Sequence, residues 1–361
     1  MDNVDTNSGE SFAPAIPPNR PVIKTIAIVA VACLLVVGLV RLVSAGGKLM
    51  QYTHQPLGIM STDCTLVVVT PANQYSNARK ALHDAEARLR NVESRMNIYI
   101  EHSELSNFNS AQGGEKTRLS PQTLAVLLAS KDMHIQSGGA FDVTIGPVVR
   151  LWKSSARTGS LPTPQQISQA RQASSWNLIS IEPDGVVKQS STVAVDLGGI
   201  AKGFAVDEAL EAMALADVTG GMVNLGGNIR VFGDRTDGKP WTVGVKNPFD
   251  PQNEANLIAK VILNNEAIAT SAHYNRFVTI AGRNYSHIID PRTGAPADQV
   301  ASVTVIAPTA MQADGWSTTL AVLGPEGLRR LPKGVDALVI TGNSRAHRLH
   351  ATEGFAAKMV K

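Results

Sequence analysis

The order of apolar and polar residues divides the chain into four stretches. Residues 1–22 are rich in Asn, Ser, Pro and acidic residues and have no apolar period, which is typical of a disordered tail. Residues 23–45 are almost continuously apolar, and the run from Thr25 to Val40 carries no charge. A helix that spans a bilayer needs about 20 such residues, so we interpret this stretch as a single transmembrane helix. A short tether, 46–59, then leads into a domain over 60–361.

Two other interpretations of the apolar stretch remain open. A cleaved signal peptide would end at the small residues "VSA" before Gly46, but the long polar tail and Arg41 argue against one. Lipidation of Cys33 would leave a further apolar run, "LLVVGLV", where the soluble part of a lipoprotein normally begins. Orientation in a membrane is not set by the flanking charges, because two basic residues lie on each side of the uncharged run.

Inside the domain the apolar period changes from that of strands to that of helices and back. Thr65–Thr70 reads as a strand, and Asn73–Met96 reads as an amphipathic helix. The core face of this helix consists of Ala81, Ala85, Leu89 and Val92. A second helix opens at Ser120, a suitable cap that precedes a proline. From Val187 onward short β-branched runs, including "STVAVDLGG", alternate with glycine-rich turns and at least two helices. This pattern favours a mixed-sheet α+β domain over a doubly wound parallel one.

Composition and charge narrow the functional classes. The 361 residues are 43% hydrophobic and 17% charged, which is sufficient for a packed core. The formal net charge is +3, and no basic run is interleaved with aromatic residues, so we expect no nucleic-acid partner. Two cysteines, Cys33 and Cys64, are too few for a zinc cluster or a disulfide framework.

The segment "VAVDLGGIAKGFAVDEAL", Val193–Leu210, runs from an apolar strand through glycines into a helix. Backbone amides at such a helix start favour an anion, for example phosphate. The glycines do not match the dinucleotide-binding fingerprint, and Lys202 precedes the last glycine, whereas a P-loop lysine follows it. A tight connection with Lys202 in water is the alternative. The nearby "GGNIRVFG", Gly226–Gly233, predicts a hairpin or a bulge.

Two further segments concentrate polar side chains. The stretch 267–277 presents Ser271, His273, Tyr274 and Arg276 after an apolar strand. In "HIIDPRTGAP", His287 and Asp290 lie three residues apart in a turn that Pro291 and Gly294 stiffen. Arg292 in this turn either binds a phosphate or ties the turn to a carboxylate.

The segment "ADGWSTTLAVLG", Ala313–Gly324, begins a helix that carries Asp314 and Thr318. Side chains four residues apart point to the same side of a helix. A carboxylate and a hydroxyl in this arrangement can bind Mg²⁺, which takes oxygen ligands and leaves room for substrate phosphates. The alternative is that Asp314 only caps the helix.

Taken in order, these segments resemble the Mg²⁺-dependent flavin transferases of the ApbE family. The resemblance runs from about Met60 to Gly324 and rests on these motifs: "SELSNFN", "GGAFDVTIGPVVRLW", "DLGGIAKGFAVD", "NLGGNI", "ATSAHYNRF", "HIIDPRTGAP" and "ADGWSTTLAVLG". It implies an ApbE-like domain that binds FAD with Mg²⁺. A threonine hydroxyl of a target flavoprotein subunit would attack the phosphorus on the riboflavin side, and AMP would leave.

The resemblance also implies a role for individual residues. The metal ligands would be Asp314, Thr318 and the backbone carbonyl of Ala201. The FAD-binding residues would be Asp196, Gly199, Lys202, Asp207, Asn224, Gly226, Ser271, Tyr274, Arg276 and Arg292. His287 and Asp290 would orient or deprotonate the incoming threonine.

The sequence departs from the family pattern in two places. "MSTDC" stands where Met-Gly-Thr is usual, and Ala272 and His273 stand where a glycine and often an acid are expected, which adds bulk near the flavin. The family further implies a single-pass protein of the bacterial inner membrane with its catalytic domain in the periplasm. Two alternative activities are an FAD pyrophosphatase giving FMN and AMP, and a flavin-carrying accessory factor for one redox system such as nitrous oxide reduction.

Overall fold

The computed structural model of the protein describes residues 47–272 and 277–360. The expected tail, 1–22, and the apolar stretch, 23–45, lie outside these ranges. Among the helices of the described residues, none has both the length and the hydropathy that a membrane crossing requires.

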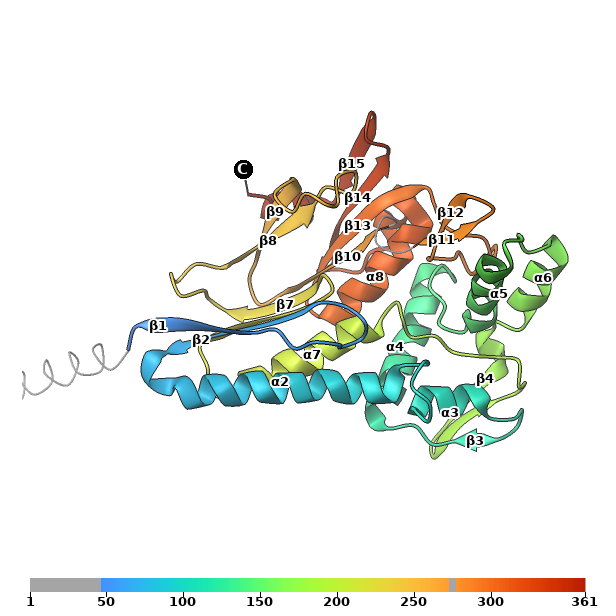
Figure 1. Ribbon diagram of the computed structural model, residues 1–361, viewed down its shortest axis with the longest axis horizontal. Coiled ribbons are helices and arrows are strands. Elements are labelled where there is room, and N and C mark those ends of the chain that lie inside the picture. The colour runs from blue at the N-terminus through green and yellow to red at the C-terminus, as the bar shows by residue number, and fades with distance from the viewer. Residues whose placement is uncertain (1–46, 273–276, 361) are drawn as a thin grey trace, which may run out of the picture. The chain divides into compact units, whose positions relative to one another are not determined.

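An antiparallel sheet of eight strands is the centre of the domain (Figure 1). In spatial order its strands are β1 (Leu49–His54), β2 (Cys64–Pro71), β6 (Gly220–Leu225), β7 (Asn228–Gly233), β10 (Ala267–Ala272), β13 (Val300–Ala307), β14 (Asp336–Gly342) and β15 (His347–Ala351). Every neighbouring pair in this sheet is antiparallel. The α+β class is therefore confirmed, whereas the expected mixture of strand directions is not found in the main sheet.

Both faces of the sheet are buried. On β2, Leu66 and Val68 belong to the core under the helices, whereas Val67 and Val69 belong to a second core on the opposite face. This alternation follows from the two-residue period of a strand. The first face packs against α2 (Tyr75–Met96), α7 (Ala201–Ala214) and α8 (Ala310–Leu323). The second is covered by the hairpin β8 (Trp241–Lys246) and β9 (Leu257–Leu263), and by α9 (Glu353–Lys358).

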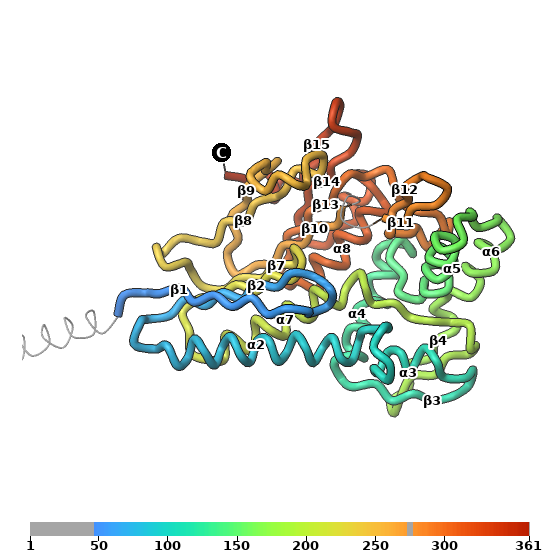
Figure 2. Tube along the Cα trace, in the orientation of Figure 1, coloured from blue at the N-terminus to red at the C-terminus, as the bar shows by residue number. Residues whose placement is uncertain are grey.

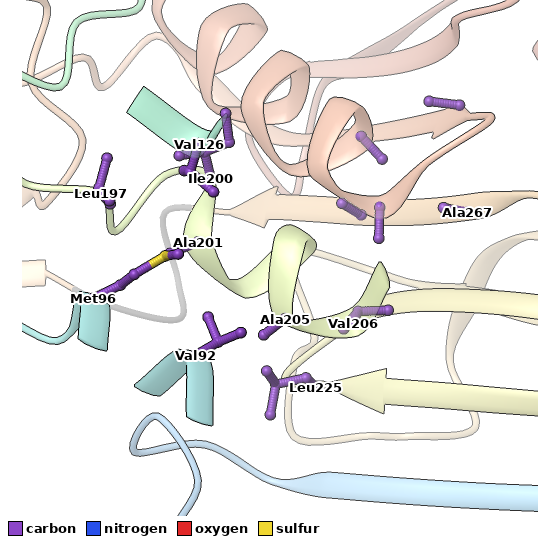
Figure 3. Packing of buried hydrophobic residues seen from close by; sticks show 14 of the residues in the cluster. Val92, Met96, Val126, Leu197, Ile200, Ala201, Ala205, Val206, Leu225 and Ala267 are labelled. Atoms are coloured by element: carbon purple, nitrogen blue, oxygen red, sulfur yellow. The ribbon is translucent and has the colours of Figure 1, made fainter. Parts of the chain in front are cut away.

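Helix α7 packs against both α2 and α8. Met96 of α2 points towards Ala201, the first residue of α7, and Val126 of α4 (Pro121–Ser137) lies close to Ile200 (Figure 3). The predicted face of α2 is buried throughout. Ser120 caps α4 by accepting a hydrogen bond from the Thr123 amide, as its sequence predicted.

The remaining elements lie around α4, at the end of the domain away from β1 (Figure 2). They are α3 (Glu104–Ser110), α5 (Gly146–Thr158), α6 (Pro164–Gln172), a small sheet of β3 (Lys116–Thr117), β5 (Gly185–Lys188) and β4 (Ile179–Glu182), and the hairpin β11 (Phe277–Ile280) and β12 (Arg283–Ser286). Three 3₁₀ turns complete the described chain at Ala72–Gln74, Trp176–Leu178 and Gly324–Arg330.

Two expectations from the sequence need correction. The tether, 46–59, contains β1, which pairs with β2 along its whole length at the edge of the main sheet. The expected strand over 191–199 forms only an isolated parallel bridge between Ala194 and Ile145. Its backbone is instead held by the side chain of Asn109, which donates to the Val195 carbonyl and accepts from the Val195 amide, both at 2.8 Å.

Candidate functional site

Asp314 lies on α8 where this helix crosses the start of α7. Its side chain is almost fully buried, and one carboxylate oxygen accepts a hydrogen bond of 3.0 Å from the Gly203 amide. The ammonium of Lys202 lies 3.4 Å from each carboxylate oxygen. Thr309, not Asp314, caps α8, because its hydroxyl accepts from the Gln312 amide. Asp314 therefore faces the neighbouring helix from inside α8, and the cap alternative is wrong.

Thr318 lies one turn further along α8 and faces the glycine turn that precedes α7. Its hydroxyl donates to the carbonyl of Gly199 at 3.4 Å. A Cβ at position 199 would lie 3.2 Å from Oγ1 and Cγ2 of Thr318, so the turn packs tightly against this side chain. The carbonyl that reaches Thr318 is thus that of Gly199. Ala201, the predicted carbonyl ligand, already belongs to α7, where carbonyls accept amides four residues on.

These oxygens form the donor set of the candidate site. No group of three or more His, Cys, Asp or Glu side chains within 47–272 and 277–360 is arranged to hold a metal ion. A cation here would depend on one carboxylate, one hydroxyl and one carbonyl, with water and substrate oxygens filling its shell. Mg²⁺ is commonly bound by one or two carboxylates together with waters and substrate phosphates.

The turn between Asp196 and α7 is closed by local hydrogen bonds. Asp196 accepts from the Gly198 amide at 2.9 Å, and its own amide donates to the Val143 carbonyl at 2.7 Å. Lys202 donates to the Gly198 carbonyl at 3.1 Å. The Lys202 ammonium therefore joins this turn to Asp314, so it is not simply solvated as the alternative interpretation held.

Asp207, predicted to bind FAD, has all its hydrogen-bond partners inside the protein. It accepts from the amides of Ala310 and Met311, at 2.8 and 2.9 Å, and pairs with Arg230 at 2.9 Å. Burial raises the pKa of Asp207 to about 6, while Arg230 and the two amides oppose the shift. These contacts tie α7 and β7 to the N-terminus of α8, so Asp207 supports the helix that carries Asp314.

Asn224 and Gly226 lie in the turn between β6 and β7. Leu225 pairs with Asn228, and the two glycines between them have φ values of +61° and +90°, which confirms the predicted hairpin. Asn224 accepts from the Gly227 amide at 3.0 Å. A Cβ at Gly226 would lie 2.4 Å from the Thr62 hydroxyl, so the turn packs directly against the segment that precedes β2.

Ser271, at the end of β10, is connected to the same part of α8. Its hydroxyl lies 2.8 Å from that of Ser317, which in turn donates to the Asp314 carbonyl at 2.9 Å. Tyr274 and Arg276, together with His273, lie outside the described residues. The structure therefore brings Ser271 to the candidate site, and the other two residues stay predictions.

The turn from His287 to Pro296 packs against α5 and α6. Arg292 makes a bidentate pair with Asp290, through Nε at 2.9 Å and Nη2 at 2.8 Å, and this pairing raises the pKa of Arg292. Trp152 donates to the carbonyl of Gly294, whose φ is +73°. Of the two interpretations of Arg292, phosphate binding or a tie to a carboxylate, the structure shows the second, with Asp290 as the carboxylate. His287 is exposed.

A cavity of about 260 Å³ lies beside Asp196. Its lining residues are Ile98, Tyr99, Ser106, Asn109, Ser110, Gly146, Val149, Arg150, Lys153, Ala194, Val195 and Asp196. Among them only Asp196 was predicted from the sequence as a site residue. The others come from α3 and the segment before it, from α5, and from Ala194 and Val195, which precede Asp196.

Comparison with known proteins shows which family has this fold and these motifs. The ApbE family model matches residues 60–339. The chain belongs to the ApbE family. It is 34% identical to the FAD:protein FMN transferase of Haemophilus influenzae over 79% of this chain and 82% of that protein. A relative with the same name from Vibrio cholerae is 36% identical over 66% of this chain and 72% of its own.

Solved ApbE structures have the same fold. The flavin transferase ApbE from Vibrio cholerae superposes with a TM-score of 0.75 and 28% identity, covering 86% of this chain and 99% of its own. The apo flavinyl transferase ApbE from Pseudomonas stutzeri gives a TM-score of 0.72 and 27% identity over 86% and 96%. The resemblance inferred from the motifs is therefore confirmed.

The ApbE motif "GGAFDVTIGPVVRLW" contains further polar groups that the sequence analysis did not single out. Asp142 accepts from the amide and the hydroxyl of Thr144, both at 2.7 Å, and lies 3.4 Å from Nδ1 of His134. Burial raises the pKa of Asp142. A Cβ at Gly139 would touch both His134 and Arg292. The pair of Asp142 and His134 therefore lies next to the turn that contains His287 and Arg292. The signal in the sequence was the motif itself, not any periodicity.

Proposed function

We propose that this protein is an FAD:protein FMN transferase that attaches FMN to a threonine of a target flavoprotein subunit. The threonine oxygen forms a bond to the phosphorus on the riboflavin side of FAD, the bond from that phosphorus to the bridging oxygen breaks, and AMP leaves. The names of the relatives support the activity. The observation that carries the proposal is the meeting of Gly199, Asp314 and Thr318 at the start of α7.

Mg²⁺ fits the oxygen atoms gathered there. We infer that Asp314, Thr318 and the carbonyl of Gly199 hold it; the carbonyl of Ala201, two residues on, is the ligand that the family resemblance implies. When bound, the cation neutralises charge on the pyrophosphate and so assists departure of AMP. The Lys202 ammonium, 3.4 Å from both Asp314 oxygens, is close enough to move from the carboxylate to a phosphate oxygen.

The remaining groups of the site would bind and orient FAD. The glycine turn between Asp196 and Lys202 leads into the N-terminus of α7, where the helix dipole favours a phosphate, and the amides of Gly198 and Ala201 already donate to protein oxygens. The cavity beside Asp196 would take an uncharged part of FAD against Ile98 and Val149. Asn224 and Gly226 remain candidates for the same role through the turn that packs on Thr62.

His287 is the better candidate for the group that accepts the threonine proton. The Asp290 carboxylate already accepts three hydrogen bonds from Arg292, including the one from its amide at 2.9 Å, and so is poorly placed to take a proton. We propose that Asp290 and Arg292 orient the turn and that His287 acts as the base.

We further propose that residues 23–45 anchor the protein in the bacterial inner membrane as a single-pass helix, with the catalytic domain in the periplasm. The uncharged run from Thr25 to Val40 supports the anchor. Carbonate extraction tests attachment to the membrane, and protease digestion of spheroplasts tests the side. Release into the carbonate supernatant contradicts the anchor, and protection from protease in intact spheroplasts contradicts the periplasmic domain.

The activity is tested with the full-length protein in detergent micelles, FAD, MgCl₂ and a flavin-carrying subunit of a membrane redox complex as the acceptor. Fluorescent acceptor on a denaturing gel, lost on chelation and with the acceptor threonine changed to valine, supports transfer. AMP and FMN released at the same rate without acceptor would make the protein an FAD pyrophosphatase. Flavin retained without turnover would indicate an accessory factor. The Asp314→Asn variant is the matched control, and we expect it to transfer no FMN.

A further inference from the structure

One face of α5 carries three cations. Arg150, Lys153 and Arg157 lie three and four residues apart and are all exposed, so they form one basic stripe along the helix. The opposite face of α5 is buried through Val148 and Trp152. The basic stripe, defined here as Arg150, Lys153 and Arg157, is therefore the solvent side of an amphipathic helix.

Within the described ranges, none of these three cations makes an ion pair. Arg150 donates to the Thr192 carbonyl at 3.3 Å, and Lys153 donates to the Tyr99 hydroxyl and lies 4.8 Å from the centre of the Tyr99 ring. The acidic residues that follow Tyr99 in the sequence, Glu101 and Glu104, have other partners. Glu104 accepts from Ser120 and Thr123, and Glu101 lies 3.7 Å from His102.

The basic stripe starts at the candidate site. Arg150 and Lys153 line the cavity together with Asp196, the residue that opens the glycine turn before α7. Buried Lys188 donates to the Asn109 carbonyl at 2.6 Å, behind the wall of the same cavity, and burial lowers the pKa of its ammonium. Arg157 lies two turns further on, outside the cavity lining. Positive charge thus extends from the site along the surface of α5.

We propose that the basic stripe of α5 is the docking surface for an acidic segment of the target protein, next to the threonine that receives FMN. This inference rests on the proposed function, because it assumes a protein acceptor. Complementary charge of this kind speeds encounter and selects partners more than it adds affinity. The exposed ring of Tyr99, held by Lys153, would form the apolar part of the same surface.

The experiment compares two short fluorescein-labelled peptides by fluorescence anisotropy. Each has one threonine, flanked by Asp and Glu in one peptide and by Asn and Gln in the other. The full-length protein in neutral detergent, loaded with FAD, should bind the acidic peptide roughly tenfold tighter at low salt, and the difference should shrink as salt rises. Equal binding of the two peptides overturns the proposal.

Variants of Arg157 test whether α5 causes the tighter binding of the acidic peptide. Arg157→Glu should weaken binding of the acidic peptide by about fivefold or more, and Arg157→Gln should weaken it less. The control is Arg345→Glu, an exposed arginine in the turn between β14 and β15, distant from α5 in Figure 1. The docking proposal is wrong if Arg345→Glu has the same effect, or if Arg157→Glu lowers FAD affinity and leaves peptide binding unchanged.

The two proposals can fail separately. Peptide binding is measured without turnover, so a protein that prefers the acidic peptide but transfers no FMN contradicts the proposed function and leaves the docking surface in place. A protein that transfers FMN while binding both peptides equally contradicts the docking surface alone.

Discussion

The backbone amide of Gly203 in α7 donates a hydrogen bond of 3.0 Å to the carboxylate of Asp314 in α8. This contact brings the carboxylate to the start of α7, next to Lys202 and the turn of Gly199. A Cβ at position 203 would lie 2.2 Å from the Ala310 carbonyl oxygen and 2.8 Å from the Asp314 Cβ. The two helices can therefore approach this closely only because residue 203 is glycine.

Gly203→Ala should separate α7 from α8. The added methyl group meets backbone of the partner helix, which cannot move aside as a flexible side chain can, so we expect a loss of about 1–3 kcal/mol in the free energy of unfolding. FMN transfer should fall with it, because Asp314 loses its amide partner. Urea unfolding and transfer rate measure the two effects. A variant with unchanged stability and rate would contradict the close helix contact.

Asp314→Asn should remove metal-dependent transfer and weaken cation binding. The amide keeps one acceptor oxygen but loses the charge that a divalent cation needs. Mn²⁺ binding, followed by electron paramagnetic resonance without FAD, gives a readout apart from activity. Thr318→Ala should weaken Mn²⁺ binding, and Thr318→Ser should restore it because the hydroxyl is kept. If all these variants bind Mn²⁺ like the unmodified protein, the cation site lies elsewhere.

His287→Ala should abolish transfer while the protein stays folded, because the side chain is exposed and is not part of the core. Asp290→Asn should behave differently, since it breaks the bidentate pair with Arg292: we expect about 1 kcal/mol less stability and partial activity. Transfer rate and thermal unfolding of both variants distinguish the roles. The control is His83→Ala, a similarly exposed histidine on α2. Full activity of His287→Ala would exclude this residue from the chemistry.

Asp207 makes stability depend on pH. Its pKa rises from 3.8 to about 6 on folding, so between these values the unfolded chain releases the proton and the folded one keeps it. Stability should therefore fall as pH rises from about 4 to 6, by up to about 3 kcal/mol at roughly 1.4 kcal/mol for each unit, and then level off. Asp207→Asn should lose this dependence. Urea unfolding across the range measures it, and the same slope in both proteins would assign it to other groups.

Local sequence patterns predicted the features that depend on residues close together in the sequence. The buried face of α2 follows from its 3.6-residue period, the cap of α4 from Ser120, and the β6–β7 turn from two adjacent glycines. β1 escaped prediction because an edge strand of six residues is defined mainly by its pairing with β2. The segment around Val195 looked like a strand, but its backbone partner is the side chain of Asn109, 86 residues away, which no local period records.

The candidate site was predictable in composition but not in geometry. The spacing of Asp314 and Thr318 predicted that they lie on one side of α8, whereas the contact of Thr318 with the Gly199 carbonyl depends on how the turn before α7 folds back onto α8. Asp207 was assigned to FAD because it follows the glycine motif, yet its partners are the amides of α8. Such assignments depend on helix packing, so only the three-dimensional structure could supply them.

The most direct measurement of the central claim is the stoichiometry of transfer in a single reaction. The full-length protein, FAD, MgCl₂ and the acceptor subunit are incubated together, AMP is measured by chromatography, and FMN on the acceptor is located by mass spectrometry of its peptides. We predict one AMP for each FMN attached, with FMN on a threonine and none formed after chelation. AMP in large excess over attached FMN, or attachment that persists without a divalent cation, would contradict the account.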